Sequence, residues 1–237
     1  MSNMISICGV FRSMLAAMTL AAAVAAQTPA RTDRFDVAGV HVTIRYLDSR
    51  IAGLHPRPRT LIRRAWPRMV DLFGGPPRTL TRQAYDTFAV TLSYGPGEGS
   101  SAPQSIRLQM APEALMFGYS NWEDALLHEL VHFWNANTFR YASRREQWFS
   151  EGVTEYYALR LARELDVISA NDLAAKLAIL AGQYVNDPAI GTLSLAGGGD
   201  ERLRHFSLSS FYYLEVPQRF DRNSDIGRTV RSLFGVP

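Results

Sequence analysis

The stretch HELVH at residues 128–132, followed after eighteen residues by Glu151 in the sequence WFSEG, predicts both the fold and the chemistry of this chain. Side chains four residues apart lie on one face of a helix, with Cβ atoms about 5–6 Å apart, so His128 and His132 can converge on one ion. Hydrolytic zinc sites use three protein ligands and leave a fourth position for water, and two His with one Glu form a known ligand set. We therefore expect one Zn²⁺ ion held by His128, His132 and Glu151.

The carboxylate inside this stretch has a different predicted role. Glu129 is rotated by about 100° around the helix from His128, so it need not be a ligand. It can accept a proton from the attacking water and return that proton to the leaving amine. We therefore predict Glu129 as the general base and acid of a hydrolase.

Other candidate residues lie further along the chain. Glu155 follows Glu151 by one helical turn and can accept a hydrogen bond from the second ring nitrogen of a ligating His, although a solvent-facing carboxylate is the alternative. Hydrolysis also needs a hydrogen-bond donor for the developing oxyanion. The candidate donors are Tyr212, Tyr213 and His205, each of which has a structural alternative as a core aromatic or a surface residue.

The short histidine motif can also arise by chance, because the chain contains five histidines. A domain without metal, in which both histidines are ordinary helix residues, is therefore an alternative. The helical context of the motif and the fitting distance to Glu151 favour the metal site.

The secondary-structure pattern predicts a small sheet followed by helices. Alternating apolar residues indicate strands at 35–47, 88–94 and 105–110, with a Gly/Ser/Pro loop at 95–103. A helix is expected at 60–73, with a break or kink near Pro67. We expect a mostly antiparallel sheet and an α+β fold.

The second half of the chain has helical periodicity. A helix that carries both histidines is expected from residue 120, with Ser120 and Glu123 as its capping box. Two more helices are expected at 148–165 and from Ser169 towards residue 184, and 186–204 has the composition of a long loop.

The N-terminus has the order of a secretory signal: Arg12, a short apolar run and small residues. We expect a signal peptide at 1–25, a linker at 26–34 and a single zincin-like domain at 35–237. The apolar run is shorter than the roughly 20 residues of a membrane-spanning helix, which leaves an uncleaved anchor as the less favoured alternative. The predicted location is periplasmic or extracellular, and Cys8 would leave with the signal, which excludes thiol catalysis.

The charge of the chain does not indicate a nucleic-acid partner. The formal net charge is +3, and loss of Arg12 with the signal leaves +2. An arginine stripe occurs at helical spacing and is interpreted as a solvated helix face. Its members are Arg57, Arg59, Arg63, Arg64 and Arg68. The expected partner is a peptide or protein substrate, and no stable membrane span is expected after signal cleavage.

The stretches HELVHFWN at 128–135 and WFSEGVTEYY at 148–157 resemble the signature of gluzincin metallopeptidases, and of the glycyl aminopeptidase family in particular. The resemblance covers about residues 120–180. It implies a thermolysin-like domain in which His128, His132 and Glu151 bind zinc and Glu129 is the base. It also implies a catalytic tyrosine some sixty residues after the third ligand, where Tyr212 and Tyr213 lie.

The chain departs from this pattern in its substrate-binding strand. Relatives carry a Gly-rich strand ending in an acid that binds the substrate's amino terminus, and 105–112 has no such acid. The chain also lacks room for the family's large N-terminal β domain and PDZ-like module, so a compact relative and a domain truncated at its C-terminus are both open. The leading hypothesis is a zinc metallopeptidase with exo or endo action undecided. A weakly active or inactive binding or assembly protein of the cell envelope is the alternative.

Overall fold

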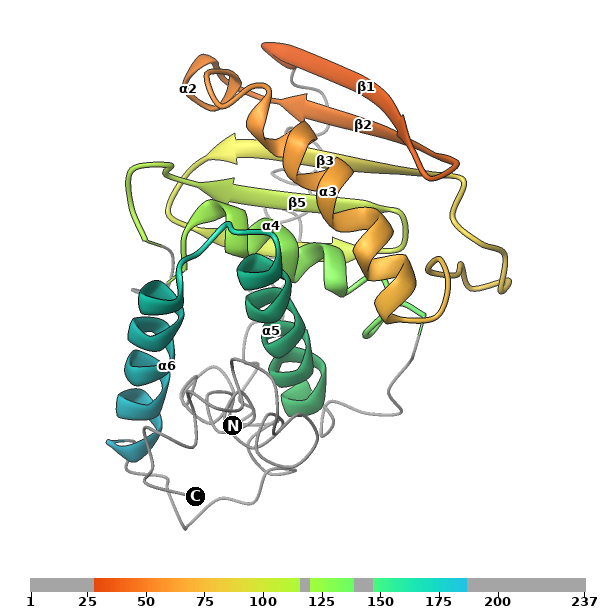
Figure 1. The fold of residues 1–237 in the computed structure, drawn as a ribbon. Coiled ribbons are helices and arrows are strands. Elements are labelled where there is room, and N and C mark those ends of the chain that lie inside the picture. Colours follow the sequence, from red (N-terminus) through yellow and green to blue (C-terminus); the bar gives the residue numbers. More distant parts are fainter. Residues whose placement is uncertain (1–27, 116–119, 139–146, 187–237) are drawn as a thin grey trace, which may run out of the picture.

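The computed structural model describes residues 28–115, 120–138 and 147–186 of the 237, with the side chains of 147–149 and 184 left aside (Figure 1). The predicted signal, all but the first residue of the predicted loop at 186–204, and the candidates Tyr212, Tyr213 and His205 lie outside these residues. The described part is an α+β fold in which a sheet precedes three helices. No helix within it is both long and apolar enough to cross a membrane.

Among the described residues, the sheet has five strands in the order β1-β2-β3-β5-β4. Antiparallel pairs occur at its two ends, β1 with β2 and β4 with β5, whereas β2–β3 and β3–β5 are parallel. The strands are β1 Arg31–Val37, β2 Val40–Tyr46, β3 Thr87–Tyr94, β4 Glu98–Ala102 and β5 Ser105–Met110. The prediction of a mostly antiparallel sheet is therefore wrong. Helix α3 (Arg57–Leu72) crosses over between β2 and β3, and such a crossover joins parallel neighbours.

The predicted strand at 35–47 contains the end of β1, a hairpin turn and β2, and the predicted linker at 26–34 contains the start of β1. Ala38 and Gly39 both have positive φ, as a two-residue hairpin turn requires. The start of β1 was not predicted, because its first inward position is occupied by a buried acid, Asp33. This carboxylate accepts a hydrogen bond from Tyr46 at 3.1 Å, and His55 Nε2 lies 3.3 Å from it.

The predicted loop at 95–103 contains β4, which forms one edge of the sheet. Its sequence, EGSSA, has no β-branched or aromatic residue, so the pattern gave no strand signal. Pairing with β5 holds it in place. The short helix α2 (Ser49–Ala52) and the long helix α3 lie between β2 and β3 in the sequence, and α3 runs through Pro67 as one helix.

The three later helices are α4 (Trp122–Val131), α5 (Gln147–Glu164) and α6 (Ala170–Val185). Their existence confirms the predicted helices. The capping box of α4 is formed by Asn121 and Asp124, one residue later than predicted, and Ser169, the predicted start of the last helix, caps α6 together with Asp172. Figure 1 shows α3 in front of the sheet and α5 and α6 extending away from it.

Aromatic packing joins the helices to the sheet in one hydrophobic core. Trp66 of α3 stacks on Phe88 of β3 with ring centroids 4.7 Å apart and meets Phe133, just after α4, edge-on. Offset-stacked and edge-to-face pairs of this kind add to the stability that burial provides. The chain at the end of α4, next to His132, is thus fixed against the sheet.

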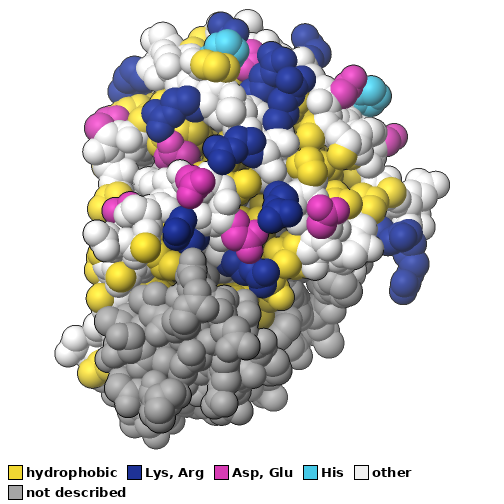
Figure 2. All heavy atoms as spheres, in the orientation of Figure 1, with side chains coloured by type: hydrophobic (Ala, Val, Ile, Leu, Met, Phe, Trp, Pro, Cys, Tyr) yellow, Lys and Arg dark blue, Asp and Glu magenta, His cyan; other side chains and the backbone are white. Residues whose placement is uncertain are grey.

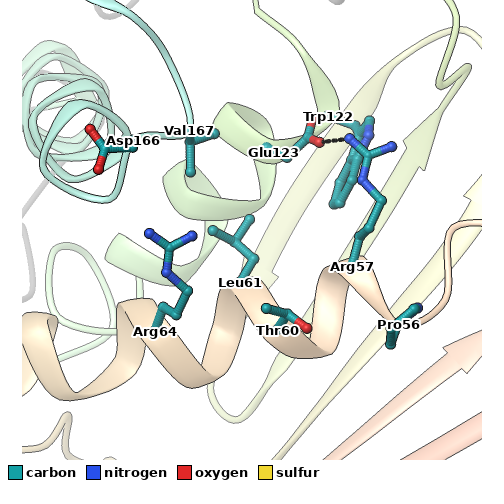
Figure 3. A pocket seen from close by; sticks show the side chains of 9 residues that line it. All are labelled: Pro56, Arg57, Thr60, Leu61, Arg64, Trp122, Glu123, Asp166 and Val167. Atoms are coloured by element: carbon teal, nitrogen blue, oxygen red, sulfur yellow. Dashed lines mark hydrogen bonds and ion pairs between the residues drawn. The ribbon is translucent and has the colours of Figure 1, made fainter.

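The arginines of α3 have specific partners, so the prediction of a simple solvated face was incomplete. Arg57 contacts Glu123 at the border of a cavity of about 320 Å³ that Arg64 also lines (Figure 3). Arg64 donates to the Leu165 carbonyl. Arg59 and Arg63 lie over the ring of Phe35. Basic and acidic side chains are interspersed on the face of the molecule in Figure 2.

Candidate metal centre

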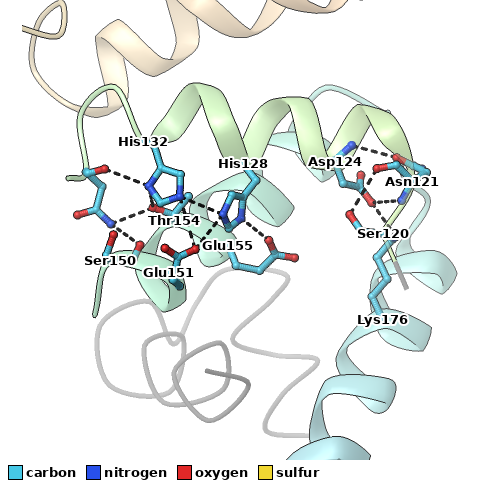
Figure 4. Close-up of polar contacts among 11 residues, drawn as sticks. Ser120, Asn121, Asp124, His128, His132, Ser150, Glu151, Thr154, Glu155 and Lys176 are labelled. Atoms are coloured by element: carbon cyan, nitrogen blue, oxygen red, sulfur yellow. Dashed lines mark hydrogen bonds and ion pairs between the residues drawn. The ribbon is translucent and has the colours of Figure 1, made fainter. Parts of the chain in front are cut away.

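Three of the predicted residues meet between α4 and α5. His128 lies in the last turn of α4, His132 is its C-cap residue, and Glu151 comes from the first turns of α5 (Figure 4). The two Nε2 atoms are 3.1 Å apart, and Glu151 Oε2 lies 3.3 Å from His128 Nε2 and 3.5 Å from His132 Nε2. Among the described residues, these three form the group of His, Cys, Asp or Glu side chains that could hold a metal ion.

The size of this triangle fits zinc. Ligand atoms about 2.0–2.1 Å from a zinc ion at tetrahedral angles lie about 3.3 Å from one another. The measured edges of 3.1, 3.3 and 3.5 Å bracket that value. The donor set of two imidazoles and one carboxylate also suits this ion.

The second nitrogen of each imidazole has its own partner. Glu155 Oε2 lies 2.7 Å from His128 Nδ1, and the carbonyl of Asn135 lies 3.2 Å from His132 Nδ1. A carbonyl only accepts, so His132 donates from Nδ1 and turns the lone pair of Nε2 towards the centre. Two imidazole nitrogens and a carboxylate that face one another at these distances require a shared proton or metal ion.

The alternative of a solvent-facing Glu155 does not hold, because this side chain is 6% exposed and contacts His128. Sequence reasoning missed Asn135 and Thr154. The Asn135 carbonyl oxygen lies 3.2 Å from His132 Nδ1, and the Thr154 hydroxyl oxygen lies 3.3 Å from the same atom. Asn135 stands in the quoted HELVHFWN stretch, but only the bend of the chain after α4 brings its carbonyl back to His132.

Electrostatics couple the ligands strongly. Burial alone would lower the pKa of His128, but hydrogen bonds to Glu151 and Glu155 outweigh it and raise that pKa well above its usual value. Burial alone would raise the pKa of Glu151, but its contacts with His128 and His132 hold that pKa well below its usual value. In the absence of metal, a proton on His128 therefore balances the carboxylates.

Glu129 stands beside the triangle and is not part of it. Its side chain is buried, and it points at Gly99 of β4: a Cβ atom on Gly99 would lie 2.1 Å from Glu129 Oε1. The edge strand that borders the centre is therefore β4, and not the stretch at 105–112 that the sequence suggested.

Zinc binding is expected to release a proton at neutral pH. The raised pKa of His128 means that its proton stabilises the metal-free protein at low pH, and this stabilisation is lost as the pH rises through the raised pKa. Zinc binds the neutral imidazole, so the affinity of the site for zinc should rise about tenfold per pH unit below the raised pKa of His128. Calorimetric titrations in two buffers with different ionisation enthalpies measure the released proton. An affinity that stays constant from about pH 6 to 8 would contradict this assignment.

A second buried polar group lies one turn earlier on α4. Lys176 Nζ of α6 lies 2.6 Å from Asp124 Oδ2, and both side chains are buried (Figure 4). Burial raises the pKa of Asp124 to about 6, although Lys176 works in the opposite direction. This ion pair fastens α6 to the start of the helix that carries the histidines.

Comparisons with known proteins agree with the site. Residues 122–211 match the family model of the M61 glycyl aminopeptidase, a span that contains α4, α5 and α6. No curated protein sequence matches the chain. Among solved structures, an aminopeptidase N family protein from Idiomarina loihiensis is similar with a TM-score of 0.61 and 13% identity, over 86% of this chain and 40% of that one.

Two M1 zinc metallopeptidase structures are also similar. A variant from Deinococcus radiodurans bound to a Tyr-Ser-Ala substrate has a TM-score of 0.44 and 18% identity, over 85% of this chain and 50% of that one. A two-domain enzyme bound to L-tryptophan has a TM-score of 0.41 and 19% identity, over the same shares. The chain thus spans half or less of these proteins. The predicted resemblance to the glycyl aminopeptidase family is confirmed for the segment that carries the metal centre, within a fold similar to that of an aminopeptidase N family protein.

Proposed function

We propose that this protein hydrolyses peptide bonds with one zinc ion held by His128, His132 and Glu151. The observation that carries the proposal is the triangle of donor atoms, with edges of 3.1 to 3.5 Å, next to the buried carboxylate of Glu129, which is not one of the three donors. The match of 122–211 to a peptidase family model supports it.

A bound zinc ion would supply a Lewis acid that lowers the pKa of water and polarises the substrate carbonyl. Glu129 orients the attacking water and accepts its proton as the water oxygen bonds to the carbonyl carbon. When the C–N bond breaks, Glu129 returns the proton to the amine nitrogen, which leaves a carboxylate and a free amine as products. Glu155 and Asn135 hold the two imidazoles so that their Nε2 atoms face the centre.

The edge strand β4 is the proposed substrate-binding element. It is the outer strand of the sheet in the described part of the chain and lies beside α4, so an extended peptide can pair with its outer edge and pass the centre. Gly99 faces Glu129, and Ser101 faces the same side and contacts Asn137. Glu98 points to the opposite side of the strand, because successive side chains alternate.

The inward side of β4 thus carries no acid that could hold a substrate's amino terminus. We therefore expect cleavage of peptides with blocked amino termini as well as free ones. Matched libraries of acetylated and free peptides, incubated with the zinc-loaded protein and with a chelator-treated sample, test the proposal by mass spectrometry. Cleavage that chelation abolishes and zinc restores supports it, whereas equal product in both samples would overturn it.

The runner-up function is peptide binding or envelope assembly without hydrolysis. It would leave the zinc site intact but produce no cleavage of any library in zinc-loaded samples. The buried position of Glu129 next to Gly99 favours hydrolysis, because peptide binding alone needs no carboxylate there. Export of the chain is proposed on the sequence of its first 25 residues alone.

Replacing Gly99 by Ala is expected to lower kcat by about 100-fold with little loss of stability. The added Cβ would displace the Glu129 carboxylate, whose flexible end can move at small energetic cost, and a shift of about 1 Å in a reacting group can cost that much. Gly182→Ala in α6 is the matched control, because nothing lies within 4 Å of its Cβ. Peptidase assays and thermal unfolding of both variants measure the effects; equal kcat values in the two variants would contradict the assigned position of Glu129.

A further inference from the structure

Asn135 connects the end of α4 to the first turns of α5. Its side chain is buried, and its Nδ2 donates to the Ser150 carbonyl at 2.8 Å and to Thr154 Oγ1 at 3.0 Å. Ser150 directly precedes Glu151, so this amide fixes the backbone next to the third donor.

The same residue orients the second histidine. His132 is the C-cap residue of α4, beyond the last regular residue Val131. Its Nδ1 lies 3.2 Å from the Asn135 carbonyl and 3.3 Å from Thr154 Oγ1, the hydroxyl that the Asn135 amide also contacts (Figure 4). The ring of His132 is therefore held from outside the helix, and its Nε2 faces Glu151.

We propose that Asn135 is a positioning residue that sets the spacing between His132 and Glu151. Its backbone carbonyl contacts His132, and its side-chain amide contacts Ser150, the residue before Glu151. Both contacts come from one side chain and its own backbone, so a shift of Asn135 moves the donors on α4 and α5 relative to each other. Neither contact involves the proposed general base. The inference rests on the proposed metal centre, although it concerns zinc affinity and not hydrolysis.

The test compares zinc affinities in the full chain, measured by competition with a chromophoric chelator. Asn135→Asp keeps the size of the side chain but removes the donor to Ser150, and Thr154→Val removes the hydroxyl between Asn135 and His132. Asn137→Ala is the matched control, because the Asn137 side chain donates to Ser101 Oγ on β4 and, among the described residues, bonds neither His132 nor α5. Circular dichroism of the metal-free proteins first establishes that each variant is folded.

The zinc Kd is expected to rise about 10- to 100-fold in Asn135→Asp, the size of effect typical for residues that orient metal ligands, and several-fold in Thr154→Val. Asn137→Ala should stay within about twofold of wild type. A lower melting temperature with an unchanged Kd in both Asn135→Asp and Thr154→Val would show a merely structural role and overturn the inference. If wild type binds zinc and the variants bind weakly but no peptide is cleaved, the inference stands and the proposed function falls. Absence of zinc binding by wild type overturns both.

Discussion

Replacing Glu129 by Gln is expected to lower kcat for peptide hydrolysis by about 100- to 10,000-fold, the usual contribution of a general acid-base residue. The amide keeps the size of the side chain but cannot accept the proton of the attacking water. Zinc affinity should change little, because the three donor atoms of the site come from His128, His132 and Glu151.

Steady-state kinetics and zinc titration of the same preparation measure both parts of this prediction. Glu113→Gln serves as the control, because Glu113 is an exposed carboxylate that accepts a hydrogen bond from the Tyr94 hydroxyl. A Gln variant at 129 that retains more than a tenth of wild-type kcat would remove Glu129 from the mechanism. Loss of zinc in that variant would instead make Glu129 a ligand.

Replacing Lys176 by Met is expected to destabilise the protein by about 3–5 kcal/mol, because it leaves the Asp124 carboxylate buried without its cation. The pKa of Asp124, already raised to about 6 by burial, should rise further. A carboxyl with a folded pKa above its unfolded value is stabilising when protonated, and this stabilisation is lost as the pH rises through the folded pKa. The penalty of Lys176→Met should therefore be larger at about pH 8 than at about pH 5.

Urea unfolding of the metal-free proteins at both pH values measures this penalty. The double variant Asp124→Asn with Lys176→Met should recover most of the lost stability, because it leaves no unpaired charge in the core. Arg160→Met, which breaks the part-exposed pair with Glu164 on α5, should cost under about 1 kcal/mol. Equal losses in Lys176→Met and Arg160→Met would show that the buried pair has no special energetic role.

Local features made the helices and the metal donors predictable. The spacing of His128 and His132 is a property of one helix, and Glu151 follows in the next predicted helix. The cap of α6 was also predictable, because Ser169 and Asp172 contact one another within a single turn. The histidine spacing and the α6 cap each lie within one or two helical turns, and Glu151 was identified from the sequence stretch in which it stands.

Features that depend on distant contacts were missed. The start of β1 was missed because Asp33 is a polar residue at an inward position, and its partners Tyr46 and His55 come from later segments. β4 has a loop-like sequence and is held by β5. The contacts of Asn135 with Ser150 and of Lys176 with Asp124 exist only once α4 has packed against α5 and α6, and no spacing within one helix indicates them.

The central claim is that His128, His132 and Glu151 hold one zinc ion, and metal analysis of the purified chain tests it most directly. Wild-type protein and Glu151→Gln are saturated with zinc, dialysed together against metal-free buffer and analysed by mass spectrometry for zinc per chain. The structure predicts close to one zinc per wild-type chain and a clear loss in Glu151→Gln. Wild-type protein that retains no zinc, or a variant that retains as much as wild type, would contradict the assignment.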